Sequence, residues 1–328
     1  MATVRLLAAL GALLGGAHAS AACPAPPPPV VSLSLVRYYA DADGTVVDRA
    51  LQRANERETA PLKLFLSQIT RMADTSVRED PGPRAGTSAA CALRWMEAWA
   101  RAGALLGRMH SKQAEHERKW DFTGLALAYV KLAPHASADQ RVVIEVWLAE
   151  LASASRRLFD DRAIKRNNHW YWLGLGLGGL ALATGSDAHW AMARAVMEDA
   201  ARDIRADGAL PAELARGQRA LHYHAFAVTP LIVLAELAHA RGEDWYALGD
   251  GALHRLARLT LDGLANPERF DVLAASPQER PSKPGAGWID LYQARFPDRM
   301  GAESPKAPRA HRWLGGDVRL LMRALGPS

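Results

Sequence analysis

The stretch Ser137–Leu158, with the sequence SADQRVVIEVWLAELASASRRL, shows how this chain folds. Ser137 is followed three residues later by Gln140, a spacing that resembles the capping box at the start of a helix. The apolar face that follows at helical spacing comprises Val143, Trp147, Leu151 and Leu158. An apolar residue every three or four positions predicts an amphipathic helix.

The same pattern recurs through most of the chain. Ser186 is placed to cap a helix that ends near Gly208, with an inward face of Trp190, Ala193, Met197, Ala200 and Ile204. Similar stripes run through residues 50–73, 90–107, 120–132, 171–183, 221–240 and 244–264. Proline and glycine predict irregular chain at 23–34, 79–86 and 266–287.

No stretch alternates between apolar and polar residues with turn residues at both ends, so a sheet of any size is not expected. No motif recurs at a fixed period either, which argues against a solenoid of repeats. Helices joined by short polar turns form antiparallel hairpins. We therefore predict an all-α protein whose hairpins are arranged as an α/α toroid, an incomplete barrel with a long central cleft.

The N-terminus predicts export. One arginine, Arg5, precedes the apolar run 6–16, and small residues follow at 17–21. This pattern is typical of a signal peptide, because the apolar run is too short to cross a bilayer. We expect no later stretch of transmembrane length and no membrane span, and we expect the chain in the bacterial periplasm. The predicted organisation is a signal peptide at 1–21, a proline-rich leader at 22–35 and a single domain at 36–328.

Cys23 and Cys91 are the only cysteines in the sequence. An even number of cysteines in an oxidising compartment favours a disulfide, which we predict between these two. Cys23 also follows the signal peptide directly, so attachment of a lipid is an alternative. Ser20 argues against it, because a leucine-like residue is usual three positions before a lipid-bearing cysteine.

Composition limits the choice of partner. Hydrophobic residues make up 49% of the chain, enough to bury a large core in one domain. Lys and Arg number 40 against 35 Asp and Glu. In an exported protein this modest basic excess points to an acidic substrate rather than to nucleic acid, although a basic surface without a special role is an equal alternative.

Two polar blocks stand out against the helical pattern. The first is Arg166–Trp172, RNNHWYW, and the second is Arg216–His224, RGQRALHYH. Together they supply an amide, an imidazole, guanidinium groups and a phenol. Those groups suit the cleavage of a polymer of sugar acids by elimination, whereas hydrolysis of a glycosidic bond needs paired carboxylates.

Elimination requires loss of the C5 proton of a uronate, which becomes acidic when the neighbouring carboxylate is neutralised. Asn168 and Arg216 can donate hydrogen bonds to that carboxylate. His169 can accept a proton near neutral pH, and Tyr223 can protonate the departing oxygen. In mannuronate the C5 proton and the leaving oxygen lie on one face of the ring, so Tyr223 alone could serve both steps with support from His169.

Other interpretations of these residues remain open. Asn167 or Asn168 can simply cap a helix. His222 and His224 have a spacing that can bind a metal on extended chain, but a helix there turns the two side chains to different faces, so we predict no metal and no cofactor. A hydrolase would have to use carboxylates in turn-like contexts, namely Asp160, Asp161, Asp207 and Glu213.

Aromatic and basic side chains near the blocks are candidates for substrate binding. Trp170 and Trp172 could stack on sugars at the rim of the cleft, although aromatic residues at helical spacing, such as Trp95 and Trp99, usually belong to the core. Arg118 and Lys119 are usually a solvated pair, but in a basic cleft they would bind further carboxylates of the polymer. Arg219 is a third candidate cation.

The two blocks, together with Cys91–Leu105, CALRWMEAWARAGAL, resemble the alginate lyases of polysaccharide lyase family 5. The resemblance extends from Cys23 to about Ala240 and returns at the Leu314–Gly316 segment, LGG. It implies an α/α toroid and metal-independent elimination, with Asn168, His169, Arg216 and Tyr223 as the catalytic set. Trp170 departs from the pattern, because the family has a small residue after the histidine.

The family also has an N-terminal lid and an arginine near the C-terminus that bind substrate. Arg37, Tyr38 and Tyr39 fall in the lid region, with Tyr39 the preferred tyrosine, and Arg312 is the counterpart near the C-terminus. The resulting hypothesis is a periplasmic lyase of poly(β-D-mannuronate) that leaves a 4,5-unsaturated end. The alternatives are a lyase of glucuronan or guluronate blocks, and a non-catalytic polyuronate-binding protein with the alginate export machinery as partner.

Overall fold

The computed structural model describes residues 23–41, 44–79, 86–161, 163–281, 287–300 and 308–326, so the predicted signal peptide lies outside the described residues. Helices dominate the described chain. The helices are α1 Arg49–Glu58, α2 Ala60–Glu79, α3 Thr87–Arg101, α4 Lys112–Leu132, α5 Ala138–Arg157, α6 Asn168–Thr184, α7 Asp187–Asp203, α8 Pro211–Leu214, α9 Ala220–Ala240, α10 Leu248–Ala265, α11 Glu268–Leu273, α12 Trp288–Arg295 and α13 Val318–Leu325.

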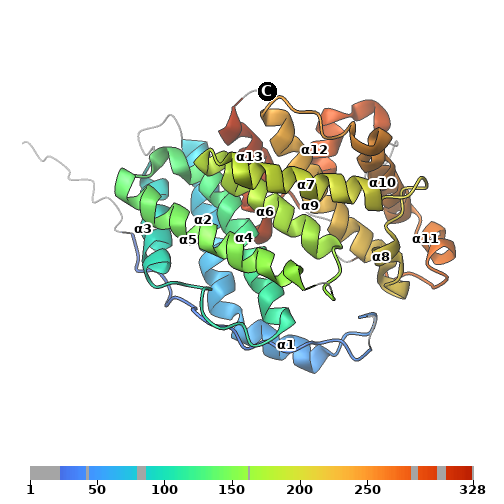
Figure 1. Cartoon of the computed structure of the whole chain (residues 1–328), viewed down its shortest axis with the longest axis horizontal. Helices are drawn as coiled ribbons and strands as arrows, with labels where there is room; N and C mark the ends of the chain where they lie inside the picture. The colour runs from blue at the N-terminus through green and yellow to red at the C-terminus, as the bar shows by residue number, and fades with distance from the viewer. Residues whose placement is uncertain are drawn as a thin grey trace, which may run out of the picture.

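The helices form antiparallel hairpins around a central layer. In sequence order, α2 is followed by α3, α4 by α5, α6 by α7 and α9 by α10, and the first member of each pair packs against the first member of the next. Figure 1 shows α4 and α6 near the middle of the molecule, with α2 and α3 towards one end and α10 and α11 towards the other. This arrangement is the predicted α/α toroid.

The inner helices differ from the outer helices in composition. In α6 and α9 apolar residues occupy all faces and almost every side chain is buried, whereas α5 and α7 bury one face only. Close approach to α6 depends on glycine. A Cβ on Gly176 would lie 2.6 Å from the Phe122 ring, and one on Gly174 would lie 2.5 Å from Val196. A helix that is apolar all round belongs inside a helical layer.

Local signals in the sequence are confirmed where they are strong. Ser137 and Gln140 form the predicted capping box at the start of α5, and Ser186 caps α7 by accepting a hydrogen bond from the His189 N–H. The predicted helix at 50–73 is wrong in one respect, since it is broken at Thr59 into α1 and α2. Pro61 explains the break, because proline is tolerated in the first turn of a helix and not in its interior.

Other boundaries also differ from the sequence prediction, among them the end of α7, which lies at Asp203 rather than near Gly208. The helix expected at 120–132 begins eight residues earlier, at Lys112, where the Ser111 side chain accepts from the Ala114 N–H. The stretch expected to be irregular at 266–287 contains α11. Two short strands, β1 Ala310–His311 and β2 Gly316–Asp317, pair antiparallel, which agrees with the absence of a larger sheet among the described residues.

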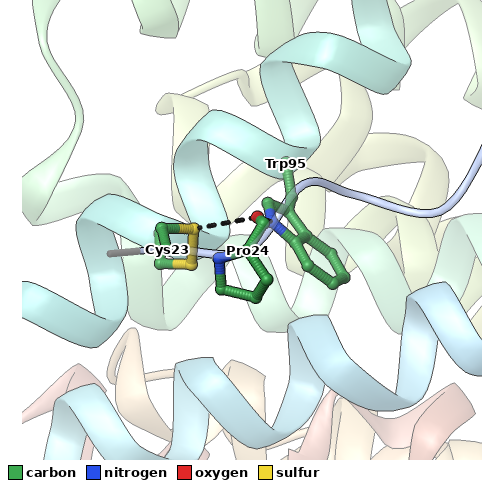
Figure 2. The surroundings of a disulfide bond; sticks show 4 residues. Cys23, Pro24 and Trp95 are labelled. Carbon is green, nitrogen blue, oxygen red and sulfur yellow. Dashed lines mark hydrogen bonds between the residues drawn. A yellow bond between two sulfur atoms is a disulfide. The ribbon is translucent and has the colours of Figure 1, made fainter. Parts of the chain in front are cut away.

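The predicted disulfide joins Cys23 to Cys91 on α3, with 5.5 Å between the Cα atoms. Beside it the Trp95 indole N–H donates to the Pro24 carbonyl at 2.8 Å, and the Trp99 indole donates to the Pro27 carbonyl at 3.0 Å. Figure 2 shows Trp95 reaching the leader next to the disulfide. Both tryptophans are buried, so they belong to the core, and they hold the leader against α3.

One described helix, 217–240, is long and apolar enough to cross a membrane by length and composition. The expectation that no stretch after the signal peptide has this length is therefore wrong for this helix. Its apolar window is 89% buried inside the protein, and the core helix of a soluble protein meets the same criterion.

Candidate active site

A cavity of about 790 Å³ opens where several parts of the chain meet. These parts are the segment 35–39 with Gly44, the region from Gln52 on α1 to Lys63 on α2, the start of α4, the start of α6, and the region from Arg216 into α9. The turn at Arg312 and Trp313 adds a further wall. Six basic side chains line the cavity against two acidic ones: Arg37, Lys63, Lys112, Arg216, Arg219 and Arg312 against Glu56 and Glu117. The cavity therefore suits a polyanion.

Arg216 and Tyr223 lie together on this wall. The guanidinium carbon of Arg216 is 3.7 Å from the centroid of the Tyr223 ring, and its Nη2 donates to the Gly44 carbonyl at 2.9 Å. Burial and Tyr39 raise the pKa of Tyr223, while Arg216 and Arg219 oppose the increase. The phenol is therefore protonated at neutral pH and lies beside cations that would stabilise a phenolate.

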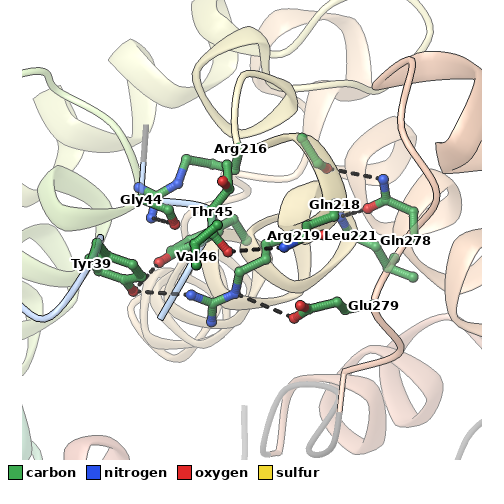
Figure 3. A network of polar contacts seen from close by, with 12 residues as sticks. Tyr39, Gly44, Thr45, Val46, Arg216, Gln218, Arg219, Leu221, Gln278 and Glu279 are labelled. Carbon is green, nitrogen blue, oxygen red and sulfur yellow. Dashed lines mark hydrogen bonds and ion pairs between the residues drawn. The ribbon is translucent and has the colours of Figure 1, made fainter. Parts of the chain in front are cut away.

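The predicted lid region lies directly over these groups. The Tyr39 and Tyr223 hydroxyls are 2.7 Å apart, and Arg219 Nη1 donates to the Tyr39 hydroxyl at 3.1 Å. Gln218 Nε2 donates to the Thr45 carbonyl at 3.2 Å. Figure 3 shows Arg216, Gln218 and Arg219 reaching the lid region in this way. The sequence placed Tyr39 near the catalytic set, and the fold brings its hydroxyl into contact with Tyr223.

Of the two tyrosines Tyr39 and Tyr223, Tyr39 loses its proton more readily, because its pKa is lowered whereas the pKa of Tyr223 is raised. Burial alone raises the pKa of Tyr39, but its hydrogen bonds with Tyr223, Tyr38 and Arg219 and the charge of Arg219 outweigh burial and lower it. Burial, then Tyr39 and Tyr223, raise the pKa of Tyr38, against a smaller opposing effect of Arg219. Arg219 therefore makes the Tyr39 oxygen the preferred site of negative charge in the pair.

His169 lies at the opposite wall, at the start of α6. Its Nδ1 is 3.0 Å from Lys119 Nζ, and its ring stacks on His116 with 3.7 Å between centroids and an interplanar angle of 6°. Burial, then Lys119, His116 and Arg216, lower the pKa of His169 well below its usual value. The imidazole is therefore neutral at neutral pH.

Asn168 precedes His169 but does not reach the cavity. Its side chain is fully buried, and its Nδ2 donates to both carboxylate oxygens of Glu213, at 3.0 and 3.1 Å. Its backbone N–H donates to Glu213 Oε1 at 2.9 Å. The expected hydrogen bond from this amide to a substrate carboxylate is thus not available in the described geometry. Asn168 and Glu213 instead fix the start of α6, and with it His169.

Comparison with known proteins identifies the family. The alginate lyase family model matches residues 35–270 of this chain. The chain belongs to the alginate lyase family. It is therefore a polysaccharide lyase, as the two polar blocks predicted.

Relatives of this lyase cover nearly its whole length. A polysaccharide lyase of Stenotrophomonas maltophilia is 41% identical, covering 96% of this chain and 95% of the relative. An alginate lyase of Pseudomonas aeruginosa is 31% identical, and the alignment covers 98% of this chain and 90% of that relative. Alginate lyase A1-III from Sphingomonas species A1 has the same fold, with a TM-score of 0.74 at 24% identity over 91% of this chain and 85% of that one.

A second solved structure of A1-III, of a variant complexed with a tetrasaccharide, aligns with a TM-score of 0.76 at 23% identity, covering 91% and 84%. These alignments confirm the α/α toroid.

Several substrate-binding candidates of this lyase lie outside the main cavity. Arg118 is buried, forms an ion pair with Glu115 and donates to the Ala154 carbonyl at 3.0 Å. Lys119 lies behind His169 and is not exposed. These two residues were predicted to bind carboxylates of the polymer, and in the structure they point into the protein. Helix α4 is buried from Glu117 to Leu132, so the cations in that part of the helix are shielded from solvent.

The tryptophans that follow His169 are also part of the packing. The Trp170 indole N–H donates to Asp199 at 3.0 Å, and the Arg166 guanidinium lies 4.6 Å from the centroid of its ring. Trp170 therefore does not provide the expected stacking surface. Trp172 is buried and donates to the Phe226 carbonyl at 3.2 Å. It lines a smaller neighbouring cavity of about 180 Å³ rather than the main one.

Trp120 and Trp313 take the place at the main cavity that was expected of Trp170. Their rings stack with 4.7 Å between centroids, and both line the cavity. Arg312, the predicted arginine, lies 4.5 Å over the Trp313 ring and 3.8 Å from Glu117. Sequence reasoning missed Trp120 as a cavity residue. One signal in the sequence could have indicated it. His116 lies four residues before Trp120, so the two side chains share one face of α4, and both line the cavity.

The two histidines of the second block separate as a helix requires. His222 lines the cavity, and burial with Arg219 and Arg216 lowers its pKa to about 4. His224 is buried, where its Nε2 accepts from the Leu210 N–H at 3.0 Å and its Nδ1 bonds the Ala220 carbonyl at 2.8 Å. Within the described ranges no group of three or more His, Cys, Asp or Glu side chains could hold a metal.

Proposed function

We propose that this chain cleaves poly(β-D-mannuronate), the mannuronate form of alginate, by β-elimination. The observation that carries the proposal is the convergence of Arg216, Tyr223 and His169 on one cavity with six basic side chains against two acidic ones. A cavity of about 790 Å³ accommodates several sugar units rather than one small molecule. The products would be oligosaccharides with a 4,5-unsaturated non-reducing end.

In the proposed reaction Arg216 neutralises the uronate carboxylate next to C5. The C5–H bond breaks, its electron pair forms the C4–C5 double bond, and the C4–O4 bond breaks. Tyr223 supplies a proton to O4, so that proton removal at C5 and protonation at O4 balance. The raised pKa of Tyr223 leaves it protonated, as a general acid must be.

Two residues qualify as the base that takes the C5 proton. His169 is neutral because its pKa is lowered, so its ring carries a lone pair. Tyr223 qualifies as a phenolate, because Arg216 and Arg219 lie 3.7 and 5.1 Å over its ring and Tyr39 contacts its oxygen. Mannuronate presents the C5 proton and O4 on the same face, which lets one phenol serve both steps.

The lid region would have to adjust when polymer binds. The reaction requires the Tyr223 hydroxyl and the Arg216 guanidinium. In the structure the Tyr223 hydroxyl is hydrogen-bonded to the Tyr39 hydroxyl, and the Arg216 guanidinium donates to the Gly44 carbonyl. Arg37 also lines the cavity in this segment. Substrate oxygens would replace these internal partners, so we assign Arg37, Tyr39, Arg219 and Arg312 to substrate binding.

The test compares defined polymers. The unsaturated product absorbs in the ultraviolet, so the rate of absorbance increase on polymannuronate, polyguluronate and glucuronan reports both reaction and preference. We expect polymannuronate to be cleaved fastest. Faster cleavage of either other polymer would overturn the mannuronate assignment while leaving elimination intact, and binding of polymer with no new absorbance would contradict the proposed reaction.

We further propose that residues 1–21 direct export to the periplasm. The disulfide between Cys23 and Cys91 supports this, since such bonds persist in oxidising compartments. Mass spectrometry of the protein from a periplasmic extract should give a chain that starts near residue 22 and has no free thiol. Full-length protein retained in the cytoplasm would contradict the proposal.

A further inference from the structure

Lys119 is a buried lysine that the proposed reaction does not use. Its side chain has no exposure to solvent, and its Nζ lies 3.0 Å from His169 Nδ1 and 4.4 Å from the centroid of the Trp120 ring. Among the described residues it forms neither an ion pair nor a hydrogen bond with a carboxylate. An amine held in this way is costly to bury whether or not it is charged, so a role through His169 is a physical reason for its presence.

The hydrogen bond between these two residues has a direction. An ammonium group can only donate, so His169 Nδ1 must accept and the ring proton must lie on Nε2. An uncharged amine also carries N–H groups, and His169 Nδ1 is the described acceptor within reach. Burial lowers the pKa of Lys119 well below its usual value, against an opposing effect of Glu117. With a proton on His169 Nδ1, an uncharged Lys119 could accept it through its lone pair, but the N–H groups of the amine would then have no acceptor among the described residues.

We propose that Lys119 is a positioning residue that keeps the ring proton of His169 on Nε2. His169 then presents an N–H group to the cavity and acts as a hydrogen-bond donor. The nitrogen that could have acted as a base, Nδ1, faces the protein interior. This inference rests on the proposed function only for its mechanistic consequence, because the position of the proton is argued from the contact between the two side chains and not from the reaction.

The charges around His169 support a neutral ring. Lys119 and His116 on α4, and Arg216 near the start of α9, face it, and none of these groups is acidic. The pKa of His116 is itself well below its usual value, chiefly through burial and then through Lys119 and Lys112, so the stacked pair is uncharged. Protonation of His169 would place a positive charge near the Arg216 guanidinium, next to the Lys119 amine and against the His116 ring.

The consequence for the reaction is a division of roles. His169 Nε2–H can donate to the uronate carboxylate or to the enolate that develops from it, together with Arg216. It cannot remove the C5 proton, because its free lone pair is bound by Lys119. That task passes to Tyr223. Before substrate displaces Tyr39, the Tyr223 proton can move to the oxygen of a deprotonated Tyr39 2.7 Å away. The Tyr223 phenolate then takes the C5 proton and delivers it to O4. Lys119 therefore decides between the two candidate bases.

The first experiment needs no variant. Nitrogen NMR of the full protein with isotope-labelled histidine distinguishes a protonated from an unprotonated ring nitrogen, and a His169→Asn sample assigns the signals. We expect His169 to be protonated on Nε2 only, from about pH 8 down to about pH 5.5, below the usual histidine pKa of about 6.5. A proton on Nδ1, or an imidazolium at about pH 6.5, would overturn the inference.

The second experiment replaces the lysine. Lys119→Met keeps the volume of the side chain and removes the donor. We expect a mixture of His169 tautomers by NMR and a fall in kcat of about ten- to a hundredfold, with a smaller change in KM. A loss of this size is typical when a group that orients a metal-bound histidine is removed, and it is smaller than the loss of about 10⁴-fold in an enzyme held in the wrong tautomer. The acidic limb of the pH profile should also move up, since a nearby positive charge is lost.

Arg118→Met is the matched control, because it removes the neighbouring buried cation on α4, which contacts Glu115 and Ala154 and not His169. It should leave the His169 tautomer unchanged. An unchanged tautomer in Lys119→Met would overturn the proposal, and if that variant does not fold, the wild-type spectrum still decides. Absence of activity on every polymer would refute the proposed function and leave the tautomer result standing.

Discussion

Replacement of Tyr223 by phenylalanine isolates one oxygen atom of the site. The phenylalanine ring can remain under the Arg216 guanidinium, which lies 3.7 Å from the centroid in the native protein. Tyr39 keeps its hydrogen bond from Arg219 at 3.1 Å. Tyr223→Phe should therefore keep the shape and charge of the cavity and remove only the hydroxyl that contacts Tyr39.

The expected effects on stability and on rate differ greatly in size. Loss of the Tyr39–Tyr223 hydrogen bond costs about 1 kcal/mol. With a melting entropy of about 2.1 cal/mol/K per residue over 328 residues, or about 0.7 kcal/mol/K, this lowers the melting temperature by about 1.5 °C. A proton-transfer group accelerates a reaction by about 10² to 10⁴, or about 3 to 5 kcal/mol, so kcat on polymannuronate should fall by about a thousandfold.

The assay is the initial rate of ultraviolet absorbance increase on polymannuronate, with calorimetry on the same samples. Tyr129→Phe is the matched control, because the buried Tyr129 hydroxyl on α4 donates to Glu145 at 3.0 Å and does not line the cavity. It should lose similar stability and no activity. Full activity in Tyr223→Phe, or an equal loss of activity in Tyr129→Phe, would refute the assignment of Tyr223.

Four further results are expected. His169→Ala should lower kcat by more than about a thousandfold with little change in the circular dichroism spectrum; a loss below tenfold would contradict its role. Glu213→Gln should destabilise the protein by about 1–3 kcal/mol in urea unfolding, because its amide would face the Asn168 amide; unchanged stability would contradict this contact. Reduction of the Cys23–Cys91 bond should cost about 4 kcal/mol, since it closes a loop of 68 residues, and an unchanged melting temperature would disprove that contribution. EDTA should leave activity unchanged, whereas a loss restored by a divalent metal would revive a metal site.

Much of the fold could be predicted from the sequence because it depends on local signals. The capping box of Ser137 and Gln140 and the cap at Ser186 act within one turn of helix, so their residues are enough to predict them. The apolar spacing predicted the helices, and the hairpin order predicted the toroid. The break at Thr59 was missed, because the apolar stripe continues through it while the backbone does not.

The candidate site could be predicted in part for a different reason. The side chains of Arg216, Tyr223 and His169 have functional groups suited to the reaction, so the residue types alone indicated them. The structure brings all three to one cavity. Tyr39 was also placed correctly, through the resemblance to the family. Asn168 was predicted to donate to a substrate carboxylate. Its contact with Glu213 could not be predicted, because the two residues are 45 positions apart in the sequence.

By itself, then, the sequence determined the helices, the pairing of the two cysteines and the chemical groups of the site. Only the tertiary structure decided which side chains those groups face. Arg118 and Lys119 looked like a solvated pair, yet packing of α4 between its neighbours buries both and sets Lys119 against His169. Trp313, not Trp170, reaches the cavity. Burial arises from contacts between residues far apart in the chain, and such contacts leave no periodic trace in the sequence.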